Sequence, residues 1–444
     1  MEDTVRLAIA FPSTLDPRQN LLFLLQVAVL LFIAVLLGAL ATRCRLPAVV
    51  GELLTGILIG PSVLGGLAPS VTSWLLPPNA AQAHLLDAVA QLGVALLVGM
   101  TGMQVDLRMA RHSTKTIVVS SVSSLVVPFA GGVAVGYLVP ASLVGTATDR
   151  LTFALFLGVA LAVSAIPVIA KTLADMDLLY RDLGQLILTA GMVDDVVAWF
   201  GLSVVSAMAT VGLAASAVGR SVLLLVGFVL GAVVLGRPLA RFLVRLAGRA
   251  REPGPTVAVA VVLILLTAAL TQSLGLEAMF GAFAAGMLLT SAGADPVQLA
   301  PLRTVVMSVL APLFLATAGL RVDLRLLSRP ELAAAALLVL AVAVGGKFLG
   351  AYLGARLVRL GHWAGIALGA GLNARGVVQI VVATVGLRLG VFGTGAYTII
   401  ILIAMVTSLM AAPVLRLSMA RIPGNVRESR RRRDQESWTS PAHR

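Results

Sequence analysis

Residues 182–210 read DLGQLILTAGMVDDVVAWFGLSVVSAMAT, an almost wholly apolar stretch with two adjacent acids, Asp194 and Asp195, near its midpoint. Its length exceeds the about 20 residues that a helix needs to cross a bilayer. A helix end capped by an aspartate is the structural alternative, but apolar residues continue on both sides. A carboxylate at the bilayer centre costs about 2.5–3.5 kcal/mol on insertion scales, so it is a functional-site candidate by default. The stretch therefore predicts a membrane helix that carries a polar site.

The composition of the whole chain agrees with a membrane protein. Of its 444 residues, 59% are hydrophobic and only 12% are charged, against about 25% charged in an average soluble domain. This excludes a soluble enzyme and a disordered chain. The single cysteine, Cys44, cannot form an intrachain disulfide. With neither a phosphate-binding loop nor a metal-ligand cluster, we expect no enzyme activity and no cofactor. The net charge is +13. In a membrane protein we expect the basic residues to lie in cytoplasmic loops and to contact anionic lipid headgroups, not nucleic acid.

Further apolar stretches follow one another with short connections. They predict an all-α polytopic membrane protein with about thirteen transmembrane helices. The predicted spans are roughly 21–42, 47–66, 83–102, 115–139, 151–175, 182–210, 217–247, 255–274, 276–292, 301–320, 331–357, 362–388 and 394–416.

The distribution of basic residues predicts how the chain is oriented. An odd number of spans places the two termini on opposite sides of the membrane. The tail, residues 417–444, is basic and contains Arg430 to Arg433, so the positive-inside rule places it in the cytoplasm. Residues 1–20 are then extracellular. We expect a multi-pass protein of the cell membrane.

A short motif occurs twice in the membrane domain, residues 21–416. Residues 102–108 read Gly-Met-Gln-Val-Asp-Leu-Arg, and residues 319–325 read Gly-Leu-Arg-Val-Asp-Leu-Arg. Seven spans separate the two copies, so they face opposite sides of the membrane. This pattern predicts inverted-topology repeats, an architecture typical of transporters. The predicted units are repeat one at about 47–210, a connector at 217–274 and repeat two at about 276–416.

One lysine lies deep inside a predicted span. Lys347 is about ten residues from the nearer helix end, or roughly 15 Å at 1.5 Å per residue. Its side chain cannot reach the headgroup region over that distance. An intramembrane lysine needs a carboxylate partner, and Asp194 or Asp195 is the expected one.

Two spans at corresponding positions of the repeats are predicted to be broken. Pro167 removes a helix hydrogen bond and disfavours helix at the residue before it. Asn373 and Arg375 bring polar groups to membrane depth in the second repeat. A proline kink is the simpler explanation of the first break. Matching breaks in two repeats nevertheless predict a transport site, where Arg375 would neutralise two half-helix C-terminal ends.

A glycine-rich segment near the first repeat contains one further acid. Gly51, Gly56 and Gly60 have a spacing that indicates close helix packing. Glu52 lies among them and is interpreted mainly as a structural charge near the cytoplasmic end of its span. It is kept as a possible accessory site residue.

Taken together, these residues resemble the monovalent cation:proton antiporter-2 family, the bacterial Na⁺/H⁺ antiporters of the NhaA/NapA-like fold. The resemblance covers about residues 47–416. It rests on the glycine motif from Gly51 to Pro61, on Ser164 to Ala170, on Asp194-Asp195, on Lys347 and on Asn373-Ala374-Arg375-Gly376. The chain departs from the family at Val377, where many relatives have an acidic residue.

The resemblance implies a role for each matching residue. Asp195 would be the ion-binding carboxylate, Na⁺ would bind at Asp195 and Asp194, and Asp194 would pair with Lys347. The crossing of the broken helices would be bordered by Ser164, Ala165 and Asn373. The fold would comprise a core domain, with spans four to six and eleven to thirteen, and a dimerisation domain that includes span one. A homodimer is expected.

The first functional hypothesis is a secondary active transporter that exchanges cytoplasmic Na⁺ for protons by alternating access, in an electrogenic cycle. A second hypothesis keeps the fold but changes the cargo to K⁺, or to an organic acid or ionophore. A third is a gated cation channel. The channel is disfavoured because the sequence has no evident selectivity filter, and because a midplane carboxylate–lysine site suits an occluded binding step.

Overall fold

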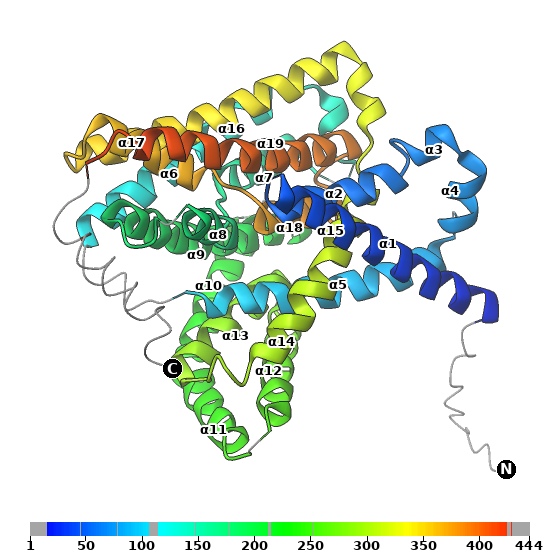
Figure 1. The fold of residues 1–444 in the computed structure, drawn as a ribbon, viewed down its shortest axis with the longest axis horizontal. Helices are drawn as coiled ribbons and strands as arrows, with labels where there is room; N and C mark the ends of the chain where they lie inside the picture. The colour runs from blue at the N-terminus through cyan, green and yellow to red at the C-terminus, as the bar shows by residue number, and fades with distance from the viewer. Residues whose placement is uncertain are drawn as a thin grey trace.

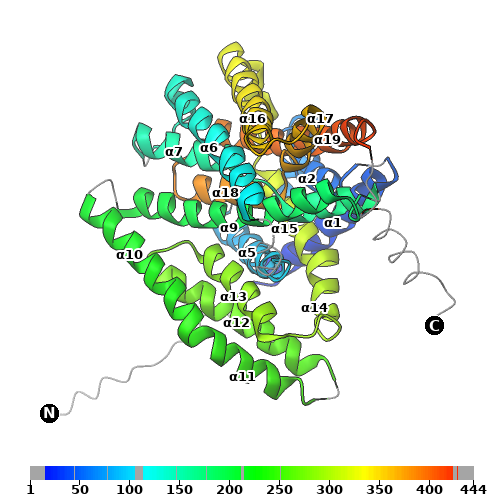
Figure 2. The ribbon, with the colours of Figure 1, turned by 90° about the vertical axis from the view of Figure 1, so that its left-hand side faces the viewer.

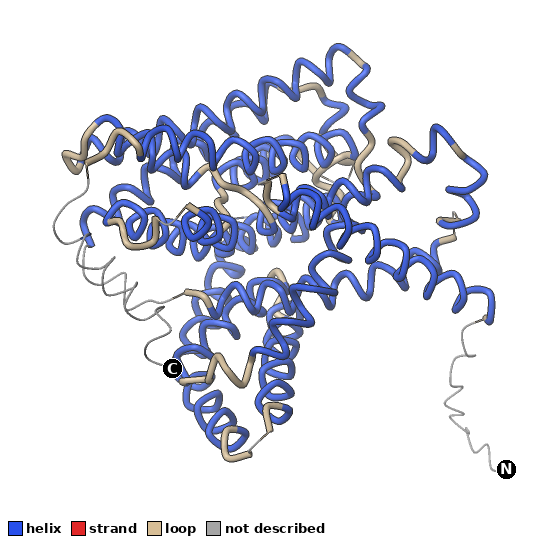
Figure 3. The backbone as a smooth tube through the Cα atoms, viewed as in Figure 1, coloured by secondary structure: helices blue, strands red, loops and turns tan. Residues whose placement is uncertain are grey.

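The computed structural model describes residues 16–44, 46–77, 79–105, 114–146, 148–176, 178–211, 215–250 and 252–423, together with residue 428. Most of the predicted extracellular and cytoplasmic ends, and Asp106 to Arg108 of the first repeat motif, lie outside these residues. Within them, helices form all of the long elements (Figure 3). The predicted all-α architecture is confirmed.

Each predicted span corresponds to one helix or to consecutive helical segments. By length and composition, eleven of the described helices can cross a membrane, or twelve when a pair bent by 50° is counted as one span. The remaining predicted span, 276–292, is α13 (Ala278–Ala292), which has only 15 residues. Most of α13 is buried, and it packs against α5 (Ala80–Met103) and α12 (Gly254–Ser273). A helix enclosed by protein does not have to match the bilayer thickness.

The helices pack as two bundles, which Figures 1 and 2 show from two sides. Helices α10 to α14 lie at the bottom of Figure 1, while α6, α16, α17 and α19 lie at its top. The first bundle consists of α6 (Thr114–Leu138), α7 (Arg150–Ala162), α8 (Ile166–Asp175), α9 (Asp182–Val211), α16 (Pro330–Leu357), α17 (His362–Leu372), α18 (Val377–Arg388) and α19 (Thr394–Met419). The second bundle consists of α1 (Pro17–Arg43), α2 (Ala48–Ile59), α5, α10 (Ala215–Gly231), α11 (Arg237–Ala247), α12, α13, α14 (Ala300–Val305) and α15 (Ala311–Leu320).

Short elements complete the chain. Two short helices, α3 (Leu64–Leu67) and α4 (Pro69–Leu75), follow α2. A π-helical segment, Ala232–Gly236, joins α10 to α11, and a second one, Val306–Leu310, joins α14 to α15.

The two copies of the repeated motif begin with glycines that have equivalent roles. Gly102 of α5 lies directly against the backbone of Phe283 in α13. Gly319 of α15 lies directly against the backbone of Leu53 in α2. Span three thus packs on span nine, and span ten packs on span two. In the predicted repeats, span three is equivalent to span ten, and span two to span nine. Each repeat therefore packs its copy of the motif helix on the first helix of the other repeat, as expected for inverted copies of one unit.

A second line of glycines brings α16 against α6. Gly346 lies over Pro128, Gly350 over Ser123, and Gly354 over Ser120. Small residues at four-residue spacing let helix backbones approach closely. Because Lys347 is next to the first of these glycines, the packing brings its side chain into the interior between α6, α7 and α9.

The two broken spans meet at their breaks. The first break separates α7 from α8 at residues 163–165, and the second separates α17 from α18 at residues 373–376. The backbone N–H of Ala165 donates to the carbonyl of Ala374 at 3.0 Å. The predicted break at Pro167 is present, although Ile166 before it is already helical. Pro167 is therefore the second residue of α8, where a proline removes no internal hydrogen bond.

Candidate functional site

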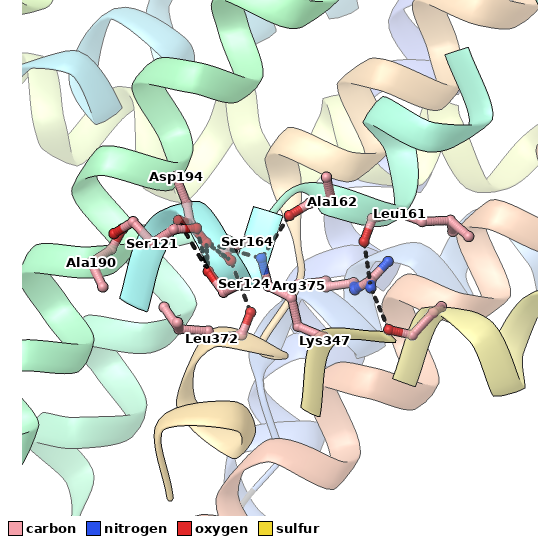
Figure 4. Close-up of polar contacts among 11 residues, drawn as sticks. Ser121, Ser124, Leu161, Ala162, Ser164, Ala190, Asp194, Lys347, Leu372 and Arg375 are labelled. Carbon is pink, nitrogen blue, oxygen red and sulfur yellow. Dashed lines mark hydrogen bonds and ion pairs between the residues drawn. The ribbon is translucent and has the colours of Figure 1, made fainter. Parts of the chain in front are cut away.

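The centre of the first bundle contains an ion pair between two fully buried side chains. Lys347 Nζ of α16 lies 2.9 Å from Asp194 Oδ2 of α9. Asp194 also accepts hydrogen bonds from Ser164 Oγ at 2.9 Å and from Ser124 Oγ at 3.3 Å (Figure 4). A buried charge needs a partner and further hydrogen bonds to offset its desolvation, and Asp194 has both. The predicted pairing of Lys347 with an aspartate is present, and the partner is Asp194.

The ion pair is joined to the first break. Lys347 Nζ donates to the carbonyl of Ala162, the last residue of α7, at 2.6 Å. Ser164 Oγ lies 2.8 Å from the carbonyl of Leu372, the last residue of α17. The Ser164 hydroxyl has one proton, so it can donate to Asp194 or to Leu372, but not to both at once. Ser164 therefore links Asp194 to the crossing of the broken helices.

Arg375 stabilises one half-helix end, not the two that were predicted. Its Nη2 donates to the carbonyl of Leu161 near the end of α7, at 2.7 Å, and to that of Ala343 in α16, at 2.9 Å. Lys347 donates to the next carbonyl of α7, that of Ala162. Two cations therefore face the negative end of this helix. The end of α17 instead receives the neutral hydroxyl of Ser164.

Asp195 differs from its neighbour in lacking partners. The residue is fully buried, yet neither carboxylate oxygen forms a hydrogen bond with a described residue. The backbone N–H of Ile166, in the first turn of α8, lies near this carboxylate but does not reach hydrogen-bond geometry. Buried polar groups without partners are rare in folded proteins and demand an explanation. A bare carboxylate of this kind can accept a proton or a cation.

Other polar side chains are also buried without partners among the described residues. Both amide atoms of Asn373, at the second break, and of Gln379, in the first turn of α18, have no hydrogen bond. Asn373 was predicted as a site residue, whereas Gln379 was not. Their amide oxygens are of the ligand type that hard cations prefer.

Several residues of this network were not predicted from the sequence. Ser124 and Ser121 of α6 face α9, where Ser121 donates to the carbonyl of Ala190 at 3.4 Å. Ser408 of α19 donates to the carbonyl of Arg375 within the second break. The run Ser120-Ser121-Val122-Ser123-Ser124 inside an apolar span was the available signal, because polar side chains at membrane depth tend to face the protein interior.

Glu52 does not belong to this cluster. It lies on α2 in the second bundle, where its side chain is close to Gly38 of α1. The glycines around it pack as predicted, with Gly51 against the backbone of Leu37 in α1 and Gly56 against that of Ala316 in α15. Its position supports the structural interpretation over the accessory one.

A cavity of about 370 Å³ lies between the two bundles. Its walls come from α5, α13 and α15 of the second bundle and from α18 of the first. The lining includes the ion pair of Arg321 with Asp87, at 2.5 Å, and Arg388, which pairs with Glu277 at 3.0 Å. The first pair lies within the second bundle, whereas the second pair joins the two bundles.

Comparison with known proteins gives a consistent result. Residues 29–419 match the family described as sodium/hydrogen exchanger, transmembrane. The chain is 30% identical over 404 residues to the Na⁺/H⁺ antiporter NhaS4 of Synechocystis sp., covering 90% of this chain and 98% of that protein. It is 27% identical over 414 residues to K⁺/H⁺ antiporter 1 of Saccharomyces cerevisiae, covering 89% of this chain but only 46% of the yeast protein.

A solved structure shares the fold. The sodium proton antiporter MjNhaP1 of Methanocaldococcus jannaschii, at pH 8, superposes with a TM-score of 0.67. The match covers 90% of this chain and 97% of that one, at 16% sequence identity. The chain therefore has the fold of a known sodium proton antiporter.

Proposed function

Because the chain belongs to the sodium/hydrogen exchanger family, we propose that it is a secondary active transporter that exchanges Na⁺ for protons by alternating access. The observation that carries this proposal is the contrast between two adjacent carboxylates. Asp194 has an ion pair and hydroxyl partners, whereas Asp195 is buried and has no hydrogen bond with a described residue. Asp195 is the group that binds either Na⁺ or a proton, and the competition between the two couples their movements.

The remaining site residues keep Asp195 in place. Lys347 holds Asp194, and Ser164 joins Asp194 to the end of α17. Arg375 stabilises the end of α7, and Asn373 supplies an amide oxygen near the second break. Ala165 and Pro167 set the geometry of the first break. Na⁺ binding at Asp195, with Asp194 beside it, replaces the missing partners with a cation.

We further propose that the cycle is electrogenic. Two carboxylates and one lysine provide enough titrating groups for two protons to move against one Na⁺. Asp195 carries one proton, and Asp194 or Lys347 carries the other. A membrane potential imposed across liposomes at equal pH should then drive a pH change whose sign follows the potential. Exchange that is indifferent to the potential would establish a one-for-one cycle.

K⁺ is the second candidate cargo, since one relative is named a K⁺/H⁺ antiporter. An organic acid or an ionophore has no comparable support. The deciding experiment uses purified protein in liposomes with a pH-sensitive dye. Na⁺, Li⁺ and K⁺ are added in turn to the outside at equal concentration. Dequenching with Na⁺ and Li⁺ but not with K⁺ supports the proposal, and a response to K⁺ alone replaces it with K⁺/H⁺ exchange.

We also propose a membrane location, an orientation and an oligomeric state for the transporter. It functions in the cell membrane, with its N-terminus outside and its basic tail in the cytoplasm. It forms a homodimer through the face that includes α1, whose exposed residues Leu24, Phe32 and Leu36 are apolar. Lipid, including anionic lipid, surrounds the rest.

A further inference from the structure

Trp199 is a fully buried side chain of α9 to which the proposed transport site gives no role. It follows Asp195 by one helical turn, and residues four apart in an α-helix lie on the same side. Side chains in a helix also lean toward its N-terminus and cover the preceding turn. We therefore expect the indole of Trp199 to lie over the turn that carries Asp195.

The hydrogen-bonding groups of these two side chains are complementary. The indole N–H of Trp199 can only donate, and it has no partner among the described residues. The charged carboxylate of Asp195 can only accept, and both of its oxygens likewise have no described partner. An unpaired buried polar group is costly. A bond between the two would remove both costs at once.

Other donors near the paired aspartates do not take this place. Lys347 Nζ donates to Asp194 at 2.9 Å. The backbone N–H of Ile166 lies near Asp195 but does not reach hydrogen-bond geometry. The indole of Trp199 is thus a neighbouring side-chain donor that is still available to Asp195.

The ring of Trp199 also contacts the second bundle. Its centroid lies 5.8 Å from that of Phe283 in α13, and the two ring planes are inclined by 33°. Phe283 is fully buried as well. Because both rings are enclosed, bulk water does not compete for the indole N–H. A hydrogen bond formed in such a low-dielectric interior is stronger than the same bond in water.

We propose that Trp199 is a positioning residue for the transported cation. When Asp195 is charged, the indole N–H donates to one carboxylate oxygen, so that the other oxygen is directed at the cation. A charged carboxylate accepts a stronger hydrogen bond than a neutral acceptor does. The bond therefore favours the cation-bound carboxylate over the protonated acid. This inference rests on the proposed exchange of Na⁺ for protons.

The variant W199F tests the role of the N–H, because it removes this group and keeps an aromatic ring against Phe283. The Na⁺ concentration that half-saturates exchange in proteoliposomes should rise about tenfold, which is equivalent to about 1.4 kcal/mol. The maximal rate should change less. Na⁺ stabilises the folded protein that binds it, so half of the Na⁺-dependent rise in Tm should also need about tenfold more Na⁺.

The matched control is F283L. It changes the same ring contact from the other side and keeps the indole N–H. Its half-saturating Na⁺ concentration should therefore stay at the wild-type value, whatever its maximal rate. A role of Trp199 in packing alone would give both variants the same shift.

A spectroscopic measurement tests the bond with the indole in place. The chain has four tryptophans, and W74F/W363F/W438F leaves only Trp199. Ultraviolet resonance Raman bands of an indole report hydrogen bonding at its N–H. In saturating Na⁺, Trp199 should show the bonded position. Asp195→Ala removes the acceptor and should move the band to the position of a free N–H.

The possible results separate this inference from the proposed function. The inference is overturned if W199F leaves the half-saturating Na⁺ concentration unchanged, if F283L shifts it equally, or if the Raman band is the same with and without the Asp195 carboxylate. A wild-type protein with neither Na⁺-driven exchange nor a Na⁺-dependent Tm overturns the proposed function itself, and the role of Trp199 with it.

Discussion

Asp194 and Asp195 are neighbours in the chain, but their surroundings give them different tasks. To bind a cation, Asp194 would have to give up interactions with Lys347 and two serine hydroxyls. Asp195 has no hydrogen bond with a described residue to give up. We therefore expect Asp195→Asn to abolish Na⁺-driven proton movement and to leave a folded protein, because asparagine keeps the shape and removes the charge. Proteoliposome exchange and a melting curve in detergent measure the two effects. Full exchange by this variant would remove Asp195 from the mechanism.

The Asp194–Lys347 pair makes a prediction about stability. Removing one partner of a buried ion pair leaves an uncompensated charge and costs about 3–5 kcal/mol. Lys347→Ala should therefore melt well below the wild type, and Asp194→Ala should do so as well. The double variant should recover part of the loss, since it removes both charges. Strictly additive losses in this double-mutant cycle would argue against a direct interaction.

Among the elements, α16 shows most clearly how close helix packing depends on glycine. A Cβ atom on Gly350 would overlap the backbone of Ser123 in α6, whereas one on Gly345 would meet nothing within 4 Å. We expect Gly350→Ala to destabilise the protein by about 1–3 kcal/mol, as overpacking generally does. Gly345→Ala is the matched control in the same helix and should be neutral or stabilising, because alanine favours helix by about 1 kcal/mol over glycine. Equal melting temperatures of the two variants would contradict close packing of α16 on α6 at Gly350.

The elements also show which features a sequence can predict. Spans follow from the length of apolar runs, and the two breaks were predicted from Pro167 and from Asn373 with Arg375, all of which are local properties. The partner of Lys347 was predictable because a buried cation needs an anion and few anions lie at that depth. The carbonyls that bind Arg375 were not predictable, because every residue carries a carbonyl and only the packing selects Leu161 and Ala343. Ser124 was missed for a similar reason, since a serine in an apolar helix can equally well bond to its own backbone.

At the scale of the whole molecule, a few polar contacts between described residues join the two bundles. The ion pair of Glu277 with Arg388 joins the segment before α13 to the end of α18. Tyr397 of α19 donates to the carbonyl of Ala318 in α15 at 2.7 Å. Both contacts lie beside or close to the cavity between the bundles. Alternating access requires part of the molecule to move, and a movement of one bundle relative to the other would break and re-form these contacts in each cycle.

A covalent link across this boundary should therefore stop exchange. Cysteines at Glu277 and Arg388, in a Cys44→Ser background that removes the single native cysteine, can be joined by a short bifunctional thiol reagent with a reducible centre. The control places cysteines at Thr256 and Gln298, whose side chains are hydrogen-bonded at 2.6 Å within the second bundle. We expect the first link to abolish exchange in proteoliposomes and reductant to restore it, while the second link leaves exchange intact. Exchange that continues with Glu277 and Arg388 positions fully linked would mean that the bundles stay fixed at this boundary, and the transport step would then have to occur inside the first bundle.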